Sequence, residues 1–364
     1  MAKRILFITD RNTHGGSLKM FVWLANAMSE FYDVWYCNLS CERPFYDLKE
    51  NVKFIEVMNK QCEAFVKRNT IGFLNNIKDV IFLIKNYKID IVVNYADHVL
   101  YSLIAAKWFV KYSLLISQRV DPYSCKKRTD IFRHGLYRYA DGLACQTAEA
   151  QMYFSDIKYN KTKKAVIANP ALRKTKLRWS KDDSDDYIIS LARIDMEQKR
   201  QDILVDAMKI VHEKYPKIKL YFYGCDVDHS VEILNKKIKE SGLEGIAVYC
   251  GITKNQYGVL SRAKMLVMAS DYEGIPNAIV EAMEIGLPVI STDCKSGGAR
   301  MLIDSSDKGI IVERNNPAKI ARAIIYYLEN MDIAAALGEN ARKSLSRFDE
   351  RKIALEWKDL IDLL

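Results

Sequence analysis

Two glutamates at a fixed spacing are the residues of this sequence with the clearest chemical potential. Glu273 and Glu281 lie in the segment DYEGIPNAIVEAMEIGLPVIST, which starts at Asp271. A tight turn follows Glu273, and a helix is predicted to begin at Asn277 and to end at Gly286. Glu281 comes four residues after Asn277, so it lies on the helix face at the opening of the site. Two carboxylates at two depths can each accept hydrogen bonds from ligand hydroxyl groups, as on a sugar and a ribose.

The backbone between the two glutamates predicts an anion site. The first N–H groups of an α-helix have no partner within the helix and attract phosphate groups. The residues that would form this turn and helix start are Gly274, Ile275, Pro276, Asn277, Ala278 and Ile279. Arg193 and Lys199 follow another predicted strand, and two such cations would stabilise charge on a departing diphosphate. Lys199 with Arg200 is also compatible with a solvated loop pair.

The segment EGIPNAIVEAMEIGLPVIST resembles the E-x7-E signature of retaining glycosyltransferases with the two-Rossmann GT-B fold, in family 4 (glycosyl transferases group 1). Ile275 is a mild departure from that signature. The segment SLARIDMEQKRQDILVDA carries Arg193 and Lys199 where the family has its diphosphate-binding cations, although the gap between them is one residue longer than usual. The resemblance implies three catalytic residues: Glu273 would hold the donor sugar, and Arg193 with Lys199 would hold the diphosphate. Glu281 would bind the ribose.

Weaker matches extend the predicted site. Gly16, in a glycine-rich loop after the first strand, would face the donor phosphate, and Gly251 with Ile252 would contact the nucleobase through their backbone. Arg119, in the segment LISQRVDPY, resembles an acceptor-side cation, and Gln118 replaces a glutamate that is common there. Asp97 and His98 form a second acceptor-side candidate. Each of these positions also has a purely structural interpretation.

Alternating strand and helix patterns in two halves predict an α/β protein with two doubly wound parallel sheets and a cleft between the domains. We expect an acceptor-binding domain over residues 1–180, a donor-binding domain over 181–345 and a terminal helix over 346–364 that returns to the first domain. The polar segment SKDDSDD, from Ser180 to Asp186, is the predicted linker.

Charge and cysteine content narrow the function classes. Residues 1–180 contain 29 Lys and Arg against 16 Asp and Glu, whereas residues 181–364 contain 26 against 30. The basic half predicts a contact with an anionic partner, such as a membrane surface or a lipid phosphate, although general solubility explains it equally well. The eight cysteines form no CxxC pair, which indicates a reducing cytoplasm and no zinc or disulfide framework. We expect a cytoplasmic protein, with a peripheral place on the inner face of the membrane as the further hypothesis.

The sequence therefore predicts transfer of a hexosyl or N-acetylhexosaminyl unit from a nucleotide-sugar, a UDP-sugar by family habit, to a glycan or lipid-linked glycan. The resemblance implies retention of the anomeric configuration, a role in bacterial surface polysaccharide such as capsule or O-antigen, and no metal or other cofactor. A GT-B-fold sugar-nucleotide epimerase is the enzymatic alternative. A basic nucleic-acid-binding protein is less consistent, because no helix-turn-helix, RNP or zinc motif is present, and no nucleic acid is expected as a partner.

Overall fold

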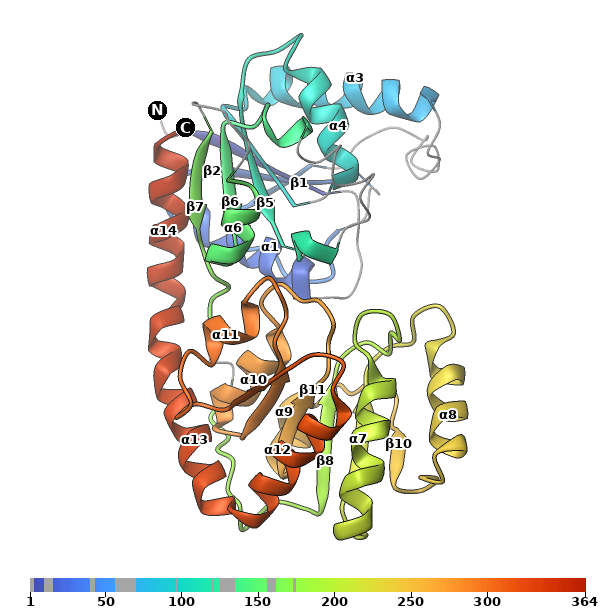
Figure 1. The fold of residues 1–364 in the computed structure, drawn as a ribbon. Coiled ribbons are helices and arrows are strands. Elements are labelled where there is room, and N and C mark those ends of the chain that lie inside the picture. The colour runs from blue at the N-terminus through green and yellow to red at the C-terminus, as the bar shows by residue number, and fades with distance from the viewer. Residues whose placement is uncertain are drawn as a thin grey trace. The chain divides into compact units, whose positions relative to one another are not determined.

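The computed structural model describes residues 3–9, 16–39, 43–55, 70–95, 97–119, 121–124, 135–155, 162–172 and 175–364. The chain divides into two compact units (Figure 1). The first unit consists of Met1–Asn169 together with Arg351–Leu364, and the second consists of Pro170–Glu350. Each unit is built around one parallel sheet. No helix among the described residues is both long and apolar enough to span a membrane.

The first unit has a seven-stranded sheet in the order β3-β2-β1-β4-β5-β6-β7, and every pairing is parallel. Its strands are β1 (Arg4–Thr9), β2 (Asp33–Asn38), β3 (Lys53–Ile55), β4 (Ile91–Asn94), β5 (Ser113–Gln118), β6 (Gly142–Cys145) and β7 (Lys163–Val166). Its helices are α1 (Gly16–Met28), α3 (Thr70–Tyr87), α4 (Asp97–Ala106), α6 (Ala148–Tyr153), the short η1 (Pro122–Ser124) and most of α14 (Glu350–Asp362).

The second unit has a six-stranded sheet in the order β10-β9-β8-β11-β12-β13, again with parallel pairings. Its strands are β8 (Tyr187–Leu191), β9 (Lys219–Tyr223), β10 (Ala247–Tyr249), β11 (Met265–Met268), β12 (Val289–Thr292) and β13 (Ile310–Val312). Its helices are α7 (Gln201–Lys214), α8 (Ser230–Glu240), α9 (Gln256–Arg262), α10 (Asn277–Ile285), α11 (Gly298–Leu302), α12 (Pro317–Glu329), α13 (Met331–Ser344) and η2 (Leu345–Phe348).

Both sheets are covered by helices on two faces, as the apolar strands require. In β1, Leu6 and Ile8 belong to the core shared with α3 and α4, whereas Phe7 packs against Phe21 of α1 at 5.4 Å between ring centroids. In the second unit α7 contacts α8 and α12, and α10 contacts α9, α11 and α13 (Figure 1). The prediction of two doubly wound α/β sheets is therefore confirmed.

Each strand order reverses beside the first strand of its sheet, between β1 and β4 and between β8 and β11. Such a switch point leaves the loops at the carboxyl ends of the two strands diverging in opposite directions, which opens a ligand crevice. The switch point of the second unit therefore lies between the loop after β8 and the loop after β11. These are the loops that carry Arg193, Lys199 and Glu273.

The helix and strand limits follow local signals closely where caps are present. Asn316 caps α12 by accepting from the Lys319 N–H, with Pro317 in the first turn, and Gly286 ends α10 with a φ of 84°. The last strand of the first sheet, β7, occupies Lys163–Val166, although the apolar run of the sequence continues to Ala168. Ile167 and Ala168 are buried beyond the end of the strand, so an apolar run that signals burial does not mark strand pairing here.

The terminal helix α14 supplies an apolar face to the first unit. Trp357 is fully buried, and the Arg119 guanidinium carbon lies 5.3 Å from the centroid of its ring. Near the end of the helix, the Tyr32 hydroxyl donates to an Asp362 carboxylate oxygen at 2.6 Å, and the Ser113 hydroxyl donates to the Leu364 carbonyl at 3.2 Å. The first unit is thus assembled from two separate stretches of chain.

Candidate active site

Glu273 is the best-anchored carboxylate at the switch point of the second unit. The residue is 8% exposed. Its Oε1 atom accepts from the Ser270 hydroxyl at 2.7 Å and forms an ion pair with the Lys199 Nζ atom. The Ser296 hydroxyl donates to the Glu273 backbone carbonyl. Side chain and backbone are therefore both fixed, and Lys199 compensates the charge of the carboxylate.

Lys199 and Glu273 were predicted from the sequence to belong to one site, but a direct contact between them was not predicted. Their side chains are 13% and 11% exposed, and a pair this sheltered from water interacts more strongly than a surface pair. A lysine ammonium has three N–H donors, so Lys199 can hold Glu273 and still donate to a phosphate oxygen. The geometry is that of a cation and an anion presented together to a polar ligand.

Arg193 lies in the same loop and is half exposed, with its side chain 50% accessible. Its guanidinium donates to the Gln198 amide oxygen at 2.6 Å and lies 3.4 Å from an Asp195 carboxylate oxygen. The Gln198 amide nitrogen in turn donates to the Tyr272 carbonyl at 3.0 Å, while the Asp271 N–H donates to the Gln198 carbonyl at 2.8 Å. The loop after β8 is thereby fastened to the loop after β11.

Sequence reasoning missed two residues that shape the loop after β8. Gln201 is 1% exposed. Its amide nitrogen donates to the Arg193 carbonyl at 2.7 Å, and its amide oxygen accepts from the Asp195 N–H at 3.2 Å. Gly224, after β9, lies so near that a Cβ atom there would meet the Ala192 carbonyl oxygen at 1.9 Å. The Gln201 side chain fixes the conformation of the loop after β8 through these two hydrogen bonds. Gly224 allows the end of β9 to approach the backbone of that loop.

The turn before α10 is packed against a second glycine. A Cβ atom on Gly298 would come within 1.7 Å of the Gly274 carbonyl oxygen. Pro276 is the N-cap residue of α10, and the Ile279 N–H bonds back to the Pro276 carbonyl at 3.1 Å. Ile275 and Ile279 are buried, so they anchor the helix start, while Asn277 and Ala278 are half-buried and lie in the first turn.

Glu281 follows one helical turn later and is half-buried. Its Oε1 atom accepts from the Gln256 amide of α9 at 3.3 Å. The next carboxylate of α10, Glu284, accepts from the Tyr257 hydroxyl, and burial together with this contact raises the pKa of Tyr257. The structure thus places Glu281 at the α9–α10 contact, on a different neighbour from the one that holds Glu273.

The proposed nucleobase contacts lie at the carboxyl end of β10. Gly251 has a φ of 77°, a left-handed conformation that favours glycine, and its carbonyl accepts from the Gly224 N–H at 2.9 Å. Ile252 is 74% exposed. Burial is the main cause that raises the pKa of Tyr223 to about 12 at the neighbouring strand end. The strand ends of β9 and β10 are therefore tied together beside an accessible apolar side chain.

Gly16, the candidate for the donor phosphate, and the acceptor-side candidates all belong to the first unit. Gly16 begins α1, and Asp97 begins α4, the helix that follows β4. The side chains of Asp97 and His98 lie outside the described residues. Arg119 is half-buried. Its guanidinium donates to the Asn169 amide oxygen at 2.6 Å and to the Tyr95 hydroxyl.

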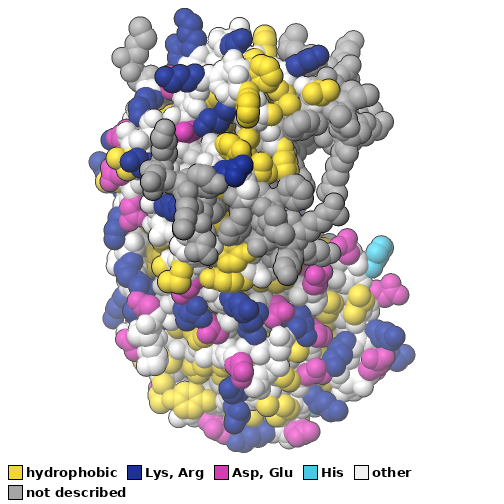
Figure 2. Space-filling view, turned by 45° about the horizontal axis from the view of Figure 1, so that its top comes forward, with side chains coloured by type: hydrophobic (Ala, Val, Ile, Leu, Met, Phe, Trp, Pro, Cys, Tyr) yellow, Lys and Arg dark blue, Asp and Glu magenta, His cyan; other side chains and the backbone are white. Residues whose placement is uncertain are grey.

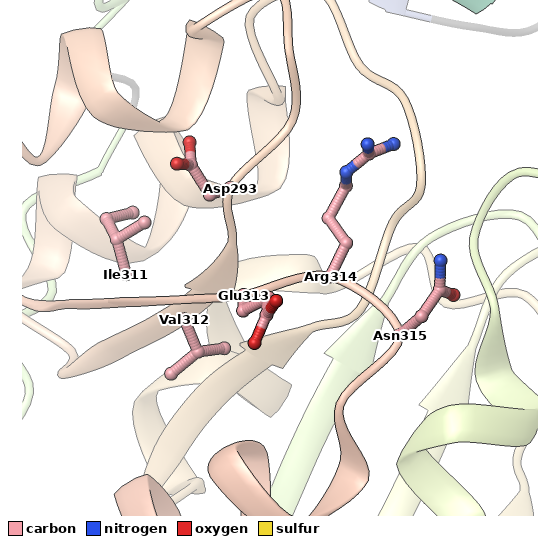
Figure 3. A pocket seen from close by; sticks show the side chains of 6 residues that line it. All are labelled: Asp293, Ile311, Val312, Glu313, Arg314 and Asn315. Carbon is pink, nitrogen blue, oxygen red and sulfur yellow. The ribbon is translucent and has the colours of Figure 1, made fainter.

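A pocket of about 360 Å³ lies at the carboxyl ends of β12 and β13 (Figure 3). Its lining residues are Asp293, Ile311, Val312, Glu313, Arg314 and Asn315. Arg314 donates to the Asp271 carbonyl at 2.8 Å, and the Asn315 amide donates to the Asp271 carboxylate at 3.1 Å. The sequence analysis did not predict this pocket, because the segment that forms β13 contains no recognisable functional motif. It is connected to the Glu273 loop through Asp271.

Among the described residues, no group of three or more His, Cys, Asp or Glu side chains is placed to hold a metal ion. The expectation that no metal takes part stays a prediction. The groups that could hold an anion at this edge are Arg193, Lys199 and the first turn of α10.

Comparison with known proteins gives a family match and relatives that align over nearly the whole chain. Residues 173–344 match the family model described as glycosyl transferases group 1. A glycosyltransferase of Haemophilus influenzae is 23% identical over 368 residues, which is 99% of this chain and 100% of the relative. An alpha-1,4-N-acetyl-D-galactosaminyltransferase of Campylobacter jejuni is 22% identical over 360 residues, 98% of each chain, and its name specifies a GalNAc-containing glycan on PP-undecaprenol as the acceptor.

The fold has a close counterpart among solved structures. The Anabaena protein HepE, solved in complex with UDP and glucose, superposes with a TM-score of 0.80 at 17% identity over 100% of both chains. At this level of identity the superposition defines the architecture, which is the GT-B fold. The family match over residues 173–344 covers both switch-point loops of the second unit. The chain therefore has the GT-B architecture, and just under half of it, residues 173–344, is similar to glycosyl transferases group 1.

Proposed function

We propose that this chain is a glycosyltransferase that moves a hexosyl or N-acetylhexosaminyl unit from a UDP-sugar to a glycan or lipid-linked glycan, with retention of the anomeric configuration, in bacterial surface polysaccharide synthesis. The observation that carries the proposal is the Lys199–Glu273 ion pair. In this proposal, Lys199 serves as a cation for a phosphate and Glu273 as an acceptor for sugar hydroxyl groups, and the first turn of α10 is a second group for the phosphate.

The proposed roles follow from charge. Arg193, Lys199 and the amino end of α10 stabilise the charge that develops on the diphosphate as its bond to the sugar breaks. Glu273, fixed by Ser270 and Lys199, accepts hydrogen bonds from the donor sugar, and Glu281 accepts them from the ribose. Because binding groups already oriented for the transition state need no rearrangement, this arrangement favours the transfer step over simple binding.

The proposed step balances without a covalent enzyme intermediate. An acceptor hydroxyl oxygen forms a bond to the anomeric carbon while the bond from that carbon to the diphosphate oxygen breaks. The hydroxyl proton passes to the departing diphosphate on the same face of the sugar, and retention follows from this same-face geometry. Positive side chains and the helix dipole neutralise the diphosphate, so we propose that no divalent ion is required.

The relatives support the finer points of the proposal. HepE was solved with UDP, which supports a uridine nucleotide, and the Campylobacter jejuni relative acts on a glycan carried by PP-undecaprenol, which supports a lipid-linked acceptor. A peripheral contact with an anionic membrane would bring the enzyme to such an acceptor. The membrane contact is part of the proposal.

A donor panel tests the proposal. The protein is incubated with UDP-, GDP- and ADP-sugars, with and without a bacterial membrane lipid extract, in the presence of EDTA, and nucleotide release is measured. We expect release from a UDP-sugar that increases with the lipid extract. Proton NMR of the product should show the anomeric coupling of the donor.

Two variants connect the activity with the site. Glu273→Ala and Arg193→Ala should lower turnover, whereas Glu240→Ala, at an exposed position of α8, should leave it unchanged. Unchanged turnover in both site variants would refute the site assignment. Conversion of one UDP-sugar into another without any acceptor would identify an epimerase instead and refute the transferase proposal.

A further inference from the structure

The pocket at the carboxyl ends of β12 and β13 lies beside the proposed donor site but is not part of it (Figure 3). Arg193, Lys199 and Glu273 follow β8 and β11, whereas the lining residues of the pocket belong to β13 and to the segments that follow β12 and β13. In the order of the sheet β13 lies two strands from β11, which is roughly 10 Å at the usual spacing of neighbouring strands. The diphosphate, sugar and ribose contacts proposed above therefore leave this pocket without a role.

The pocket is large enough for one ring-sized ligand. Its volume is about 360 Å³, and pockets that bind small molecules span roughly 300–1,000 Å³. Figure 3 shows Ile311 and Val312 on one side of Glu313, with Arg314 and Asn315 on the other. The wall thus combines apolar with polar side chains, which suits a ligand that has both kinds of surface.

Two carboxylates in the wall are each held by a basic partner. The Glu313 Oε2 atom accepts from the Lys319 ammonium at 2.8 Å and from the Asn316 amide at 3.2 Å. The Asp293 Oδ1 atom forms an ion pair with Arg300. In each case one carboxylate oxygen fixes the side chain, so the position of the second oxygen is fixed as well.

Arg314 is held by the loop that carries Glu273. Its Nη1 atom donates to the Asp271 carbonyl at 2.8 Å and lies 3.4 Å from an Asp271 carboxylate oxygen. The Asn315 amide donates to the same carboxylate at 3.1 Å, and its amide oxygen accepts from Arg200. Because Asp271 precedes Glu273 by two positions, a ligand in this pocket contacts residues that fix the Glu273 loop.

Polar atoms remain for a ligand after these contacts are made. The Oδ2 atom of Asp293, the Oε1 atom of Glu313, and the Nε and Nη2 atoms of Arg314 form no hydrogen bond with any residue in the described part of the chain. The three side chains are 38%, 62% and 29% exposed, so a ligand can reach them. Two hydrogen-bond acceptors and one forked donor therefore line the same hollow.

The charges around the pocket balance, which argues against an ionic ligand. Each of the three charged lining residues has a partner of opposite charge. Figure 2 shows Lys and Arg side chains interspersed with Asp and Glu side chains over the face of the second unit that it displays. The two carboxylates would repel a phosphate, and Arg314 would repel an ammonium group. A neutral ligand whose hydroxyl groups both donate and accept fits this set of atoms.

We propose that the pocket binds one neutral hexose or N-acetylhexosamine unit, separate from the donor sugar. Asp293 and Glu313 accept hydrogen bonds from hydroxyl groups of the ring, and Arg314 donates to a ring or hydroxyl oxygen. Ile311 and Val312 contact the apolar C–H face of the sugar. The purpose of the site, which is to hold a unit of the glycan acceptor, rests on the proposed function, whereas binding of the sugar itself does not.

Methyl NMR of the full chain, labelled at the δ1 methyl groups of isoleucine, tests the pocket directly. Ile311 reports on the pocket, Ile275 on the turn after Glu273, and Ile233, which is 53% exposed on α8, on an unrelated surface. Each signal is assigned by replacing that residue with valine. The probes are the methyl α-glycosides of glucose, galactose, N-acetylglucosamine and N-acetylgalactosamine, titrated to tens of millimolar. We expect at least one of them to shift the Ile311 signal saturably, with UDP present or absent, and to leave the Ile233 signal in place.

Carboxylate variants connect the binding with the wall of the pocket. Glu313→Ala and Asp293→Ala should each weaken glycoside binding about tenfold, since each removes a hydrogen bond to a charged group. Glu329→Ala is the matched control and should leave the affinity unchanged, because Glu329 is an exposed residue of α12 that likewise pairs with a lysine. Unfolding in denaturant shows whether the variants remain folded.

Acceptor kinetics identify the source of the sugar. If the sugar is a unit of the glycan acceptor, Glu313→Ala should raise the KM for the acceptor in the lipid extract more than the KM for the UDP-sugar. If the KM for the acceptor stays the same while glycoside binding is lost, the ligand is a free sugar. In both cases the pocket is a carbohydrate site.

Several results would overturn the proposal. It fails if no glycoside shifts the Ile311 signal, if glycosides shift the Ile275 signal alone, or if inorganic phosphate binds more tightly than every glycoside. It also fails if Glu329→Ala weakens binding as much as Glu313→Ala. An unresponsive Ile311 signal with intact UDP-sugar turnover would refute only this pocket, whereas saturable binding at Ile311 without turnover of any nucleotide-sugar would refute only the transferase function.

Discussion

Lys199 and Glu273 lie 74 positions apart in the sequence and form an ion pair at the switch point of the second sheet. Neither side chain is more than 13% exposed, so each depends on the other for charge compensation. The pair links the loop after β8 to the loop after β11. The ion pair therefore couples the loop that carries Lys199 to the loop that carries Glu273, and this coupling can be measured.

Removing either member of this pair should impair turnover, and removing both should cost less than the two effects combined. We expect Lys199→Met and Glu273→Gln each to lower kcat/KM for the UDP-sugar about 100-fold or more, because each leaves an uncompensated group where the diphosphate charge develops. In the double variant the penalty of the unpaired partner disappears. The measurement is a double-mutant cycle on kcat/KM, and strictly multiplicative effects would contradict coupling through the ion pair.

Ser270 should act as a positioning residue for Glu273. Ser270→Ala removes the hydroxyl that donates to Oε1 at 2.7 Å, while Lys199 still compensates the charge. We expect kcat to fall about tenfold with little change in KM, because the carboxylate is present but less well oriented. Ser261→Ala is the control, since that hydroxyl donates to a helix carbonyl in α9 at 3.0 Å. A loss confined to the free energy of unfolding, with kcat unchanged, would argue for a purely structural serine.

Gly298→Ala should disturb both stability and turnover. The added Cβ atom would meet the Gly274 carbonyl oxygen at 1.7 Å, so the turn before α10 must move, and overpacking of this kind costs about 1–3 kcal/mol or more. Denaturant unfolding and kcat report the two effects. Gly135→Ala provides the comparison, because a Cβ there meets no atom of the described residues within 4 Å. Equal stability of the two variants would show that the turn accommodates the methyl group easily.

Stability should fall as the pH rises above about 9, because two thiols are buried. Burial raises the pKa of Cys37 to about 12 from an ordinary 9.0, and burial likewise raises the pKa of Cys145 to about 12. A raised folded-state pKa means that the unfolded chain loses protons first, so the stabilisation is complete below pH 9 and is lost as the pH rises toward 12.

Each such thiol contributes a slope of about 1.4 kcal/mol per pH unit in that window. Urea unfolding between pH 8 and 11 measures the slope, which Cys145→Ala should reduce. A slope that is the same in the wild type and in Cys145→Ala would contradict the assignment to this thiol.

Local signals predicted the parts of the candidate site that depend on neighbours in sequence. The glycine and proline after Glu273, the helix start at Asn277 and the αL end at Gly286 are all encoded within a few residues. Strand alternation likewise predicted the sheets, because burial on both faces leaves continuous apolar runs. Those signals extend only over the length of a turn or a strand.

Contacts between distant positions could not be predicted in the same way. Nothing near Lys199 in the sequence indicates that Glu273 is its partner, and nothing near Arg119 indicates Trp357, 238 positions later in the chain. Such pairings are set by the order of strands in the sheet and by the path of the terminal helix. The role of Gly298 was missed for the same reason, since its constraint comes from the backbone of another loop.

The division of the first unit between Met1–Asn169 and Arg351–Leu364 has a consequence for biosynthesis. During synthesis on the ribosome, all of the second unit is made before the segment Arg351–Leu364, which belongs to the first unit. Trp357 can therefore contact Arg119 only after residues 170–350 have been made. Until then the apolar face that α14 covers remains open to water and to chaperones. The first unit therefore cannot complete its fold before the second unit has been synthesised. A fragment that stops at Asn169 would lack α14, so the surface that α14 covers would stay exposed.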